Sequence, residues 1–175
     1  LFLAPSGVSN GTVFVQKPVP IYGSEQVTNG DFSQTGAELI TNGDFATDSG
    51  WTYGSDWTIS NGVASASGSA FSSLSPTSVI SVSAGNTYKI TFDLNYVSGA
   101  LRAKIGGTQT GYNTYNVGYN SVEIFLTAVN TTNFSFVSAN LNGTIDNVSV
   151  KEVGQDWSLG TGISIGDDEA IFTSV

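Results

Sequence analysis

The clearest alternation of apolar and polar residues in this chain runs from Tyr88 to Val97. Its even positions are apolar and the odd positions between them are polar, so one side of the segment suits a core and the other suits water. This pattern predicts a half-buried β-strand. The apolar positions are Tyr88, Ile90, Phe92, Leu94 and Tyr96, and the polar positions are Lys89, Thr91, Asp93 and Asn95.

A second alternating run, Leu101 to Ile105, follows directly after Ser98-Gly99. If those two residues form a hairpin loop, the apolar faces of the two runs coincide and opposite charges meet on the polar face. The sequence therefore predicts a β-hairpin that turns at Ser98-Gly99. Its predicted pairs are Val97 with Ala100, Tyr96 with Leu101, Leu94 with Ala103, Phe92 with Ile105, Asp93 with Lys104 and Asn95 with Arg102.

Further alternating segments separated by turn residues complete this pattern. In the last of them Ile145 is out of phase with Val148 and Val150, which a β-bulge near Asp146-Asn147 would reconcile. Helical periodicity is missing, and at least about seven short strands follow one another at intervals of roughly 8 to 14 residues. We therefore predict an all-β fold, an antiparallel two-sheet sandwich. The further segments are 122–128, 133–137 and 143–153.

The start of this pattern is repeated along the chain. EQVTNGDF at 25–32 matches ELITNGDF at 38–45 in six of eight positions, and WSLGTGISIGDDEA at 157–170 lines up with WTYGSDWTISNGVA at 51–64. In this alignment Trp157 matches Trp51 and Ile163 matches Trp57. Self-similarity of this kind indicates copies of one structural unit. The predicted division is an extended N-terminal arm with a partial repeat at 1–37, a complete module at 38–153 and the start of a second, truncated repeat at 154–175.

The arm contains Pro5, Pro18 and Pro20 around a short apolar stretch at 12–16. Proline lacks an N–H donor and fixes φ, so we expect an extended segment that can include one edge strand. The arm is either a linker or a segment that docks onto a neighbouring subunit.

Composition excludes several functions. The chain of 175 residues has 14 acidic and five basic residues, a net charge of -9, so nucleic acid would be repelled. No apolar run approaches the length of a membrane span, so we expect no membrane insertion. Cys and His are absent, which removes disulfides and a histidine base for serine hydrolysis. The acids form no recognisable pair of glycosidase carboxylates, so we expect no catalysis.

Five features together resemble the jelly-roll carbohydrate-binding modules of the galactose-binding-like superfamily. They are the Asn-Gly-Asp-Phe opening at 42–45, Gly50-Trp51, the strand Trp57 to Ile59, the long alternating middle strand and the closing Ile145 to Val150. The resemblance covers 38–153. Tandem or truncated copies of this sequence motif are also similar to modules in virion proteins of tailed bacteriophages.

The resemblance implies a jelly-roll sandwich in a non-enzymatic virion structural protein at the virion surface, such as a fibre, tail appendage or capsid decoration. Weak adhesion to a glycan or host surface is a further role that it implies. One alternative is a binding module of a secreted bacterial polysaccharide-degrading enzyme. Another is an architectural module whose sugar site is inactive. The implied partners are other virion proteins, through residues 1–37, and a cell-surface glycan. A homo-oligomer, by analogy a trimer, is expected.

The family often binds a structural Ca²⁺ where the first strand meets the last, and Asp44 and Asp146 are at the matching positions. Carboxylates and carbonyls are the hard oxygen ligands that Ca²⁺ requires. However, the family commonly has Glu directly after the Phe, and Ala46 occupies that position here. The alternative is that Asp44 caps a turn and Asp146 bonds backbone at a bulge.

Glycan binding requires aromatic faces beside hydrogen-bonding groups. The candidates are Tyr112, Tyr115 and Tyr119 in a Gly/Asn-rich stretch, with Trp51 and Tyr53 near the module start. Trp51 and the neighbouring Trp57 could instead fill the end of the sandwich, and the tyrosines could instead contact protein.

Overall fold

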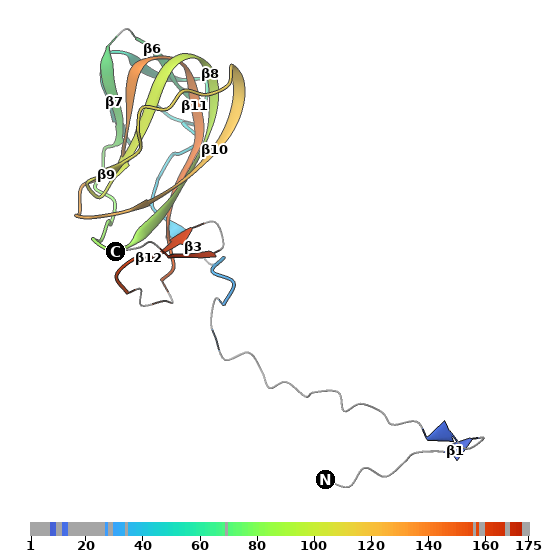
Figure 1. The fold of residues 1–175 in the computed structure, drawn as a ribbon. Coiled ribbons are helices and arrows are strands. Elements are labelled where there is room, and N and C mark those ends of the chain that lie inside the picture. The colour runs from blue at the N-terminus through green and yellow to red at the C-terminus, as the bar shows by residue number, and fades with distance from the viewer. Residues whose placement is uncertain are drawn as a thin grey trace.

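The computed structural model describes residues 8–9, 12–13, 27, 30–33, 35–68, 70–155, 157, 160–166 and 169–172. Every regular element among them is a β-strand (Figure 1), and this part of the chain has no helix long and apolar enough to cross a membrane. All pairings are antiparallel, which confirms the predicted all-β class. The strands are β1 (Val8–Ser9), β2 (Thr12–Val13), β3 (Thr35–Glu38), β4 (Trp51–Tyr53), β5 (Trp57–Ser60), β6 (Val63–Ser67), β7 (Phe71–Pro76), β8 (Thr87–Ile105), β9 (Thr108–Gln109), β10 (Gly118–Thr127), β11 (Ser135–Val153), β12 (Ile163–Gly166) and β13 (Glu169–Phe172).

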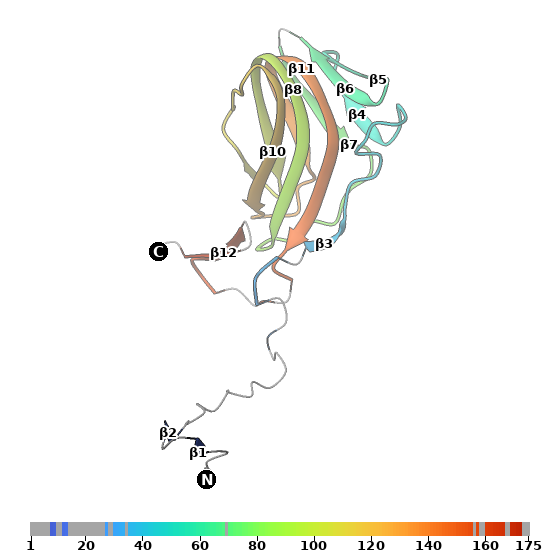
Figure 2. The same ribbon diagram turned by 90° about the vertical axis from the view of Figure 1, so that its right-hand side faces the viewer.

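Two strands of 19 residues, β8 and β11, lie side by side along the body of the molecule (Figures 1 and 2). The nine-stranded main sheet is built around them, and shifts in their register near the middle divide it into two layers. Layer 1 contains β10, residues 87–96 of β8, residues 142–153 of β11, β6 and β5, with β3 at the end of β11. Layer 2 contains β9, residues 100–105 of β8, residues 135–139 of β11, β7 and β4.

The predicted hairpin at Ser98-Gly99 is wrong, because β8 continues through both residues as one strand. From Tyr88 to Tyr96 its buried positions are even and from Leu101 onward they are odd, and its register against β11 shifts in between, so the change of phase is a β-bulge. Gly99 has a φ of +90° and approaches the backbone of Asn140, whose φ is +55°. In the observed ladders Asp93 lies opposite Ser121 and Asp146, Lys104 opposite Gln109 and Ser135, and Tyr96 opposite Gly118 and Gly143.

The hydrophobic core lies between the two layers. Phe92 of layer 1 and Phe136 of layer 2 meet edge to face, with ring centroids 4.8 Å apart. Phe134 packs on Phe136 in the same way at 4.9 Å. All three rings are buried, and each contributes roughly 1.5–3 kcal/mol by leaving water. This contact across the core makes the folded sheet a two-layer sandwich, as predicted.

The two ends of the module meet as the sequence suggested. Val148 N donates to Gly43 O at 2.8 Å, and Leu39 N donates to Val150 O at 3.0 Å. The predicted bulge is confirmed, because the register of β11 against β8 shifts between Asp146 and Ser149. The Glu38 carboxylate accepts from Val150 N at 2.9 Å and from the Ser149 hydroxyl, so it holds the strand just beyond this bulge.

The partial repeats before and after the module are brought together. Phe32 and Trp157 have ring centroids 5.0 Å apart at 38°, and Phe45 and Trp51 within the module have 5.0 Å and 39°. Trp157 N also donates to Gly154 O at 3.1 Å, as Trp57 N donates to Gly54 O at 3.1 Å. Trp157 therefore makes a ring contact like that of Trp51 and a backbone hydrogen bond like that of Trp57. Most of the predicted extended arm lies outside the described residues, and the division into 1–37, 38–153 and 154–175 stays a prediction.

Candidate functional site

The outer face of layer 2 carries an exposed aromatic pair. Phe71, the first residue of β7, is 71% exposed, and Tyr112, in the segment that runs beside β8, is 36% exposed. Their ring centroids lie 5.5 Å apart with an interplanar angle of 59°. Ala139 lies opposite Phe71, and Ala100 lies opposite Ala139, so only small side chains separate the two aromatic residues across the ladder.

The Tyr112 ring is held in place by Arg102. The guanidinium carbon of Arg102 lies 3.8 Å from the centre of the Tyr112 ring, within the range of a cation–π contact. Nη1 of Arg102 donates to Gln109 Oε1 at 3.1 Å, while Nε is buried and has no hydrogen-bond partner among the described residues. The backbone here is fixed by reciprocal hydrogen bonds between Leu101 and Asn113 at 3.0 and 2.9 Å. The result is an exposed aromatic surface packed on a cation that Gln109 also holds. We call Phe71, Tyr112 and Arg102 the aromatic face.

Tyr119 lies on the outer face of layer 1 rather than on the aromatic face. It is 71% exposed, and its hydroxyl donates to the Asp93 carboxylate, which raises the pKa of Tyr119 and lowers that of Asp93. Asn147 Nδ2 adds a second hydrogen bond to Asp93 at 2.8 Å. These three side chains form a polar cluster across β10, β8 and β11. The structure thus places Tyr112 and Tyr119 on different faces of the sandwich.

The other predicted aromatic residues are less available to a ligand. Trp51 is 6% exposed, packs on Phe45 and donates from Nε1 to Asn42 O at 2.9 Å, and Trp57 is 2% exposed. Tyr115 is half-buried against Tyr96, and burial raises its pKa. Tyr53 donates to Asp48 Oδ1 at 2.7 Å, which raises the pKa of Tyr53.

Two residues of the aromatic face were not among the predicted site residues. Phe71 is three positions before the buried Leu74 in the same strand, so alternation places its side chain on the opposite, outward face. A large aromatic side chain exposed on that face indicates a binding surface. The hairpin prediction places Arg102 opposite Asn95. Its true neighbours depend on the bulge at Gly99.

The proposed calcium ligands each accept a hydrogen bond from the backbone N–H of a residue that follows closely in the sequence. Asp44 Oδ1 accepts from Ala46 N at 3.4 Å, and Asp146 Oδ1 accepts from Asn147 N at 2.7 Å. Within the described ranges, no group of three or more Asp, Glu, His or Cys side chains could hold a metal ion. A calcium site here would therefore need backbone carbonyls as further ligands, and it stays a prediction.

Comparison with known proteins finds no matching family model and no matching curated protein. Solved structures with a similar strand arrangement include an arabinose-bound MgGH51 α-L-arabinofuranosidase, with a TM-score of 0.47 and 16% identity over 71% of this chain and 27% of that one. The enzymatically active domain of bacteriophage CBA120 tailspike protein 4 gives 0.46 and 15% over 66% and 21%. A CBM35 from Paenibacillus barcinonensis gives 0.41 and 14% over 67% and 98%. The chain thus spans less than a third of the first two proteins. These remote similarities concern the fold, so function is inferred below from this chain's own residues.

Proposed function

We propose that this chain is a non-catalytic β-sandwich module that binds a glycan on the aromatic face. The observation that carries the proposal is the exposed Phe71–Tyr112 pair beside Arg102. Sugar rings present apolar C–H faces that stack on aromatic rings, and their hydroxyls accept hydrogen bonds from a guanidinium. An open face of this kind suits weak binding of a long or repeated ligand better than enclosure of a small one.

For the two carboxyl groups whose pKa is shifted, a binding role agrees better than catalysis. A glycosidase needs one carboxyl group with a raised pKa and a second carboxylate opposite it. Hydrogen bonds lower the pKa of both Asp31 and Asp93, which is the wrong direction for a general acid.

We place this module on the surface of a tailed-bacteriophage virion, as part of a fibre, tail appendage or capsid decoration. The support is the sequence resemblance over 38–153 together with the repeated module start. A module of a secreted bacterial polysaccharide-degrading enzyme is the second candidate. Labelling intact virions, or the culture fluid of the source bacterium, with an antibody to the module distinguishes the two.

A glycan array with matched variants tests the binding site. We expect Tyr112→Ala and Phe71→Ala each to weaken binding about tenfold, because loss of a stacking ring removes on the order of 1.4 kcal/mol. Tyr112→Phe should retain binding, since the ring is kept. Tyr119→Ala is the control, because it removes a more exposed tyrosine from another face. No glycan signal from the unmodified chain, or equal loss in Tyr119→Ala, would contradict the proposal.

A further inference from the structure

The outer face of layer 2 carries a second cation beyond the aromatic face. Arg102 and Lys104 flank the buried Ala103 in β8, so alternation places both on the outer side of the sheet, with Cα atoms roughly 7 Å apart. Gln109 of β9 pairs with Lys104 in the ladder and accepts a hydrogen bond from Nη1 of Arg102 at 3.1 Å. The two positive side chains therefore share one surface with Tyr112, whose ring packs on Arg102.

The partners of these two cations in the ladders are neutral. Gln109 and Ser135 lie opposite Lys104, and Val137 lies opposite Arg102. In the part of the chain that the structure describes, neither Arg102 nor Lys104 forms an ion pair. This face therefore keeps a local positive charge.

The acidic side chains of the main sheet lie mainly on the outer face of layer 1. Asp93 and Asp146 lie opposite each other there, and Glu123 on the same face already holds Lys89, with Nζ 2.7 Å from Oε2. The Asp56 carboxylate accepts a hydrogen bond from the backbone just before β7. In a chain with only five basic residues and a net charge of -9, the outer face of layer 2 should therefore attract an anionic ligand more strongly than the outer face of layer 1.

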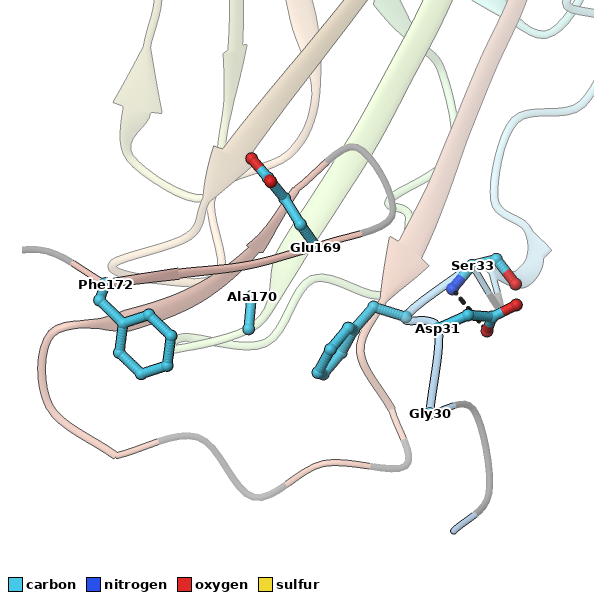
Figure 3. A pocket seen from close by; sticks show the side chains of 7 residues that line it. Gly30, Asp31, Ser33, Glu169, Ala170 and Phe172 are labelled. Atoms are coloured by element: carbon cyan, nitrogen blue, oxygen red, sulfur yellow. Dashed lines mark hydrogen bonds between the residues drawn. The ribbon is translucent and has the colours of Figure 1, made fainter. Parts of the chain in front are cut away.

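A cavity between residues 30–33 and β13 provides a contrast (Figure 3). It has a volume of about 680 Å³, and Ala170 and Phe172 give it an apolar lining. The Asp31 and Glu169 carboxylates lie at its margin and point away from this space and from each other. None of its described lining residues is basic, so this cavity offers no cation to an anionic ligand.

We propose that the ligand of the aromatic face is an acidic polysaccharide, whose sugar rings stack on Phe71 and Tyr112 and whose carboxylates pair with Arg102 and Lys104. This inference rests on the proposed function and adds the class of glycan. A guanidinium matches the two oxygens of a carboxylate in one plane, and a lysine ammonium binds a second carboxylate as a point charge. An acidic polysaccharide repeats a ring with an apolar face and a carboxylate along one chain, which suits an open surface of aromatic rings beside cations. Lys104 is thereby the residue that makes the site selective for charge.

A glycan array with neutral, carboxylated and sulfated polysaccharides tests the class of ligand with the full chain. We expect the strongest signals from carboxylated polymers such as polygalacturonate and alginate, and loss of the signal when the carboxylates of the bound polymer are methyl-esterified, because esterification removes the charge and keeps the rings. Signals confined to neutral or sulfated polymers, or an equal signal from the esterified polymer, would refute this inference and leave glycan binding by the module intact. No signal from any polymer would refute the proposed function as well.

Matched variants test the role of Lys104. Lys104→Gln should weaken binding of the carboxylated polymer about fivefold, as expected for one exposed ion pair, and Lys104→Arg should retain binding because the charge is kept. Lys151→Gln makes the same change in net charge on the outer face of layer 1 and should bind like the parent. Added salt should weaken binding by the parent more than binding by Lys104→Gln, because salt screens the charge that the variant lacks. Binding by Lys104→Gln equal to that of the parent, or an equal loss in Lys151→Gln, would refute the proposal.

Discussion

The bulge at the middle of β8 makes a quantitative prediction about two glycines. Gly99 and Gly85 have nearly the same backbone conformation, with φ values of +90° and +91°. They differ in their surroundings, because a Cβ on Gly99 would collide with the backbone of Asn140 and Leu141, whereas a Cβ on Gly85 would meet nothing within 4 Å. Comparing Gly99→Ala with Gly85→Ala therefore separates backbone strain from the close approach of β8 to β11.

The expected losses of stability follow from these two terms. A non-glycine residue at positive φ costs roughly 1–2 kcal/mol, and this should be the whole effect of Gly85→Ala. In Gly99→Ala the new methyl group must also displace the β11 backbone, and overpacking of this kind adds roughly 1–3 kcal/mol. We thus expect a total loss of about 2–5 kcal/mol for Gly99→Ala.

Urea unfolding measures both losses. Trp51 and Trp57 are buried, so their fluorescence should report the opening of the sandwich. Both variants should unfold with the slope of the parent protein, and Gly99→Ala should have the lower free energy of unfolding. Equal losses for the two variants would refute the bulge, because a glycine at the tip of a hairpin loop would have open space around its Cβ.

Two other predictions concern polar side chains. The hydrogen bond between Tyr119 and Asp93 raises the pKa of Tyr119 above its ordinary 10.0 and lowers that of Asp93 below 3.8. This hydrogen bond should therefore stabilise the fold at pH values between 3.8 and 10.0. It should be lost as the pH rises through the raised tyrosine pKa or falls through the lowered aspartate pKa, and the difference in unfolding free energy between the parent and Tyr119→Phe should vanish at both extremes. Calcium binding by Asp44 and Asp146 predicts that added Ca²⁺ raises the midpoint of thermal unfolding and that Asp146→Asn removes this rise. A midpoint that does not respond to Ca²⁺ or to a chelator would contradict it.

Local periodicity predicted most of the sandwich but not the path of β8. The alternation of Tyr88 to Tyr96 and the bulge after Asp146 follow from patterns that are visible in the sequence, whereas the meeting of Gly43 with Val148 was implied by the family resemblance. A hairpin and a bulge at Gly99 produce the same change of phase and both favour a glycine at positive φ. Pairing with β11, a segment far along the chain, decides between them, and local sequence carries no record of that pairing.

The candidate site was harder to predict for a related reason. A tyrosine is amphipathic, so Tyr112, Tyr115 and Tyr119 are equally plausible on a surface or at the edge of a core, and only the folded chain separates them. Tyr115 packs on Tyr96, while Tyr112 reaches Phe71 across β8 and β11. Contacts between segments so distant in sequence are set by the order of strands.

The course of β8 also determines the chemistry of the aromatic face. In a hairpin, Arg102 would lie opposite Asn95 and close to Asp93, where its charge would be neutralised. Because the strand continues into layer 2, Arg102 instead lies opposite Val137 and under the Tyr112 ring. There a cation is held by an aromatic ring and an amide, in a chain whose net charge is -9. The bulge that lets the sheet fold over its own core is therefore what supplies the aromatic face with its positive charge.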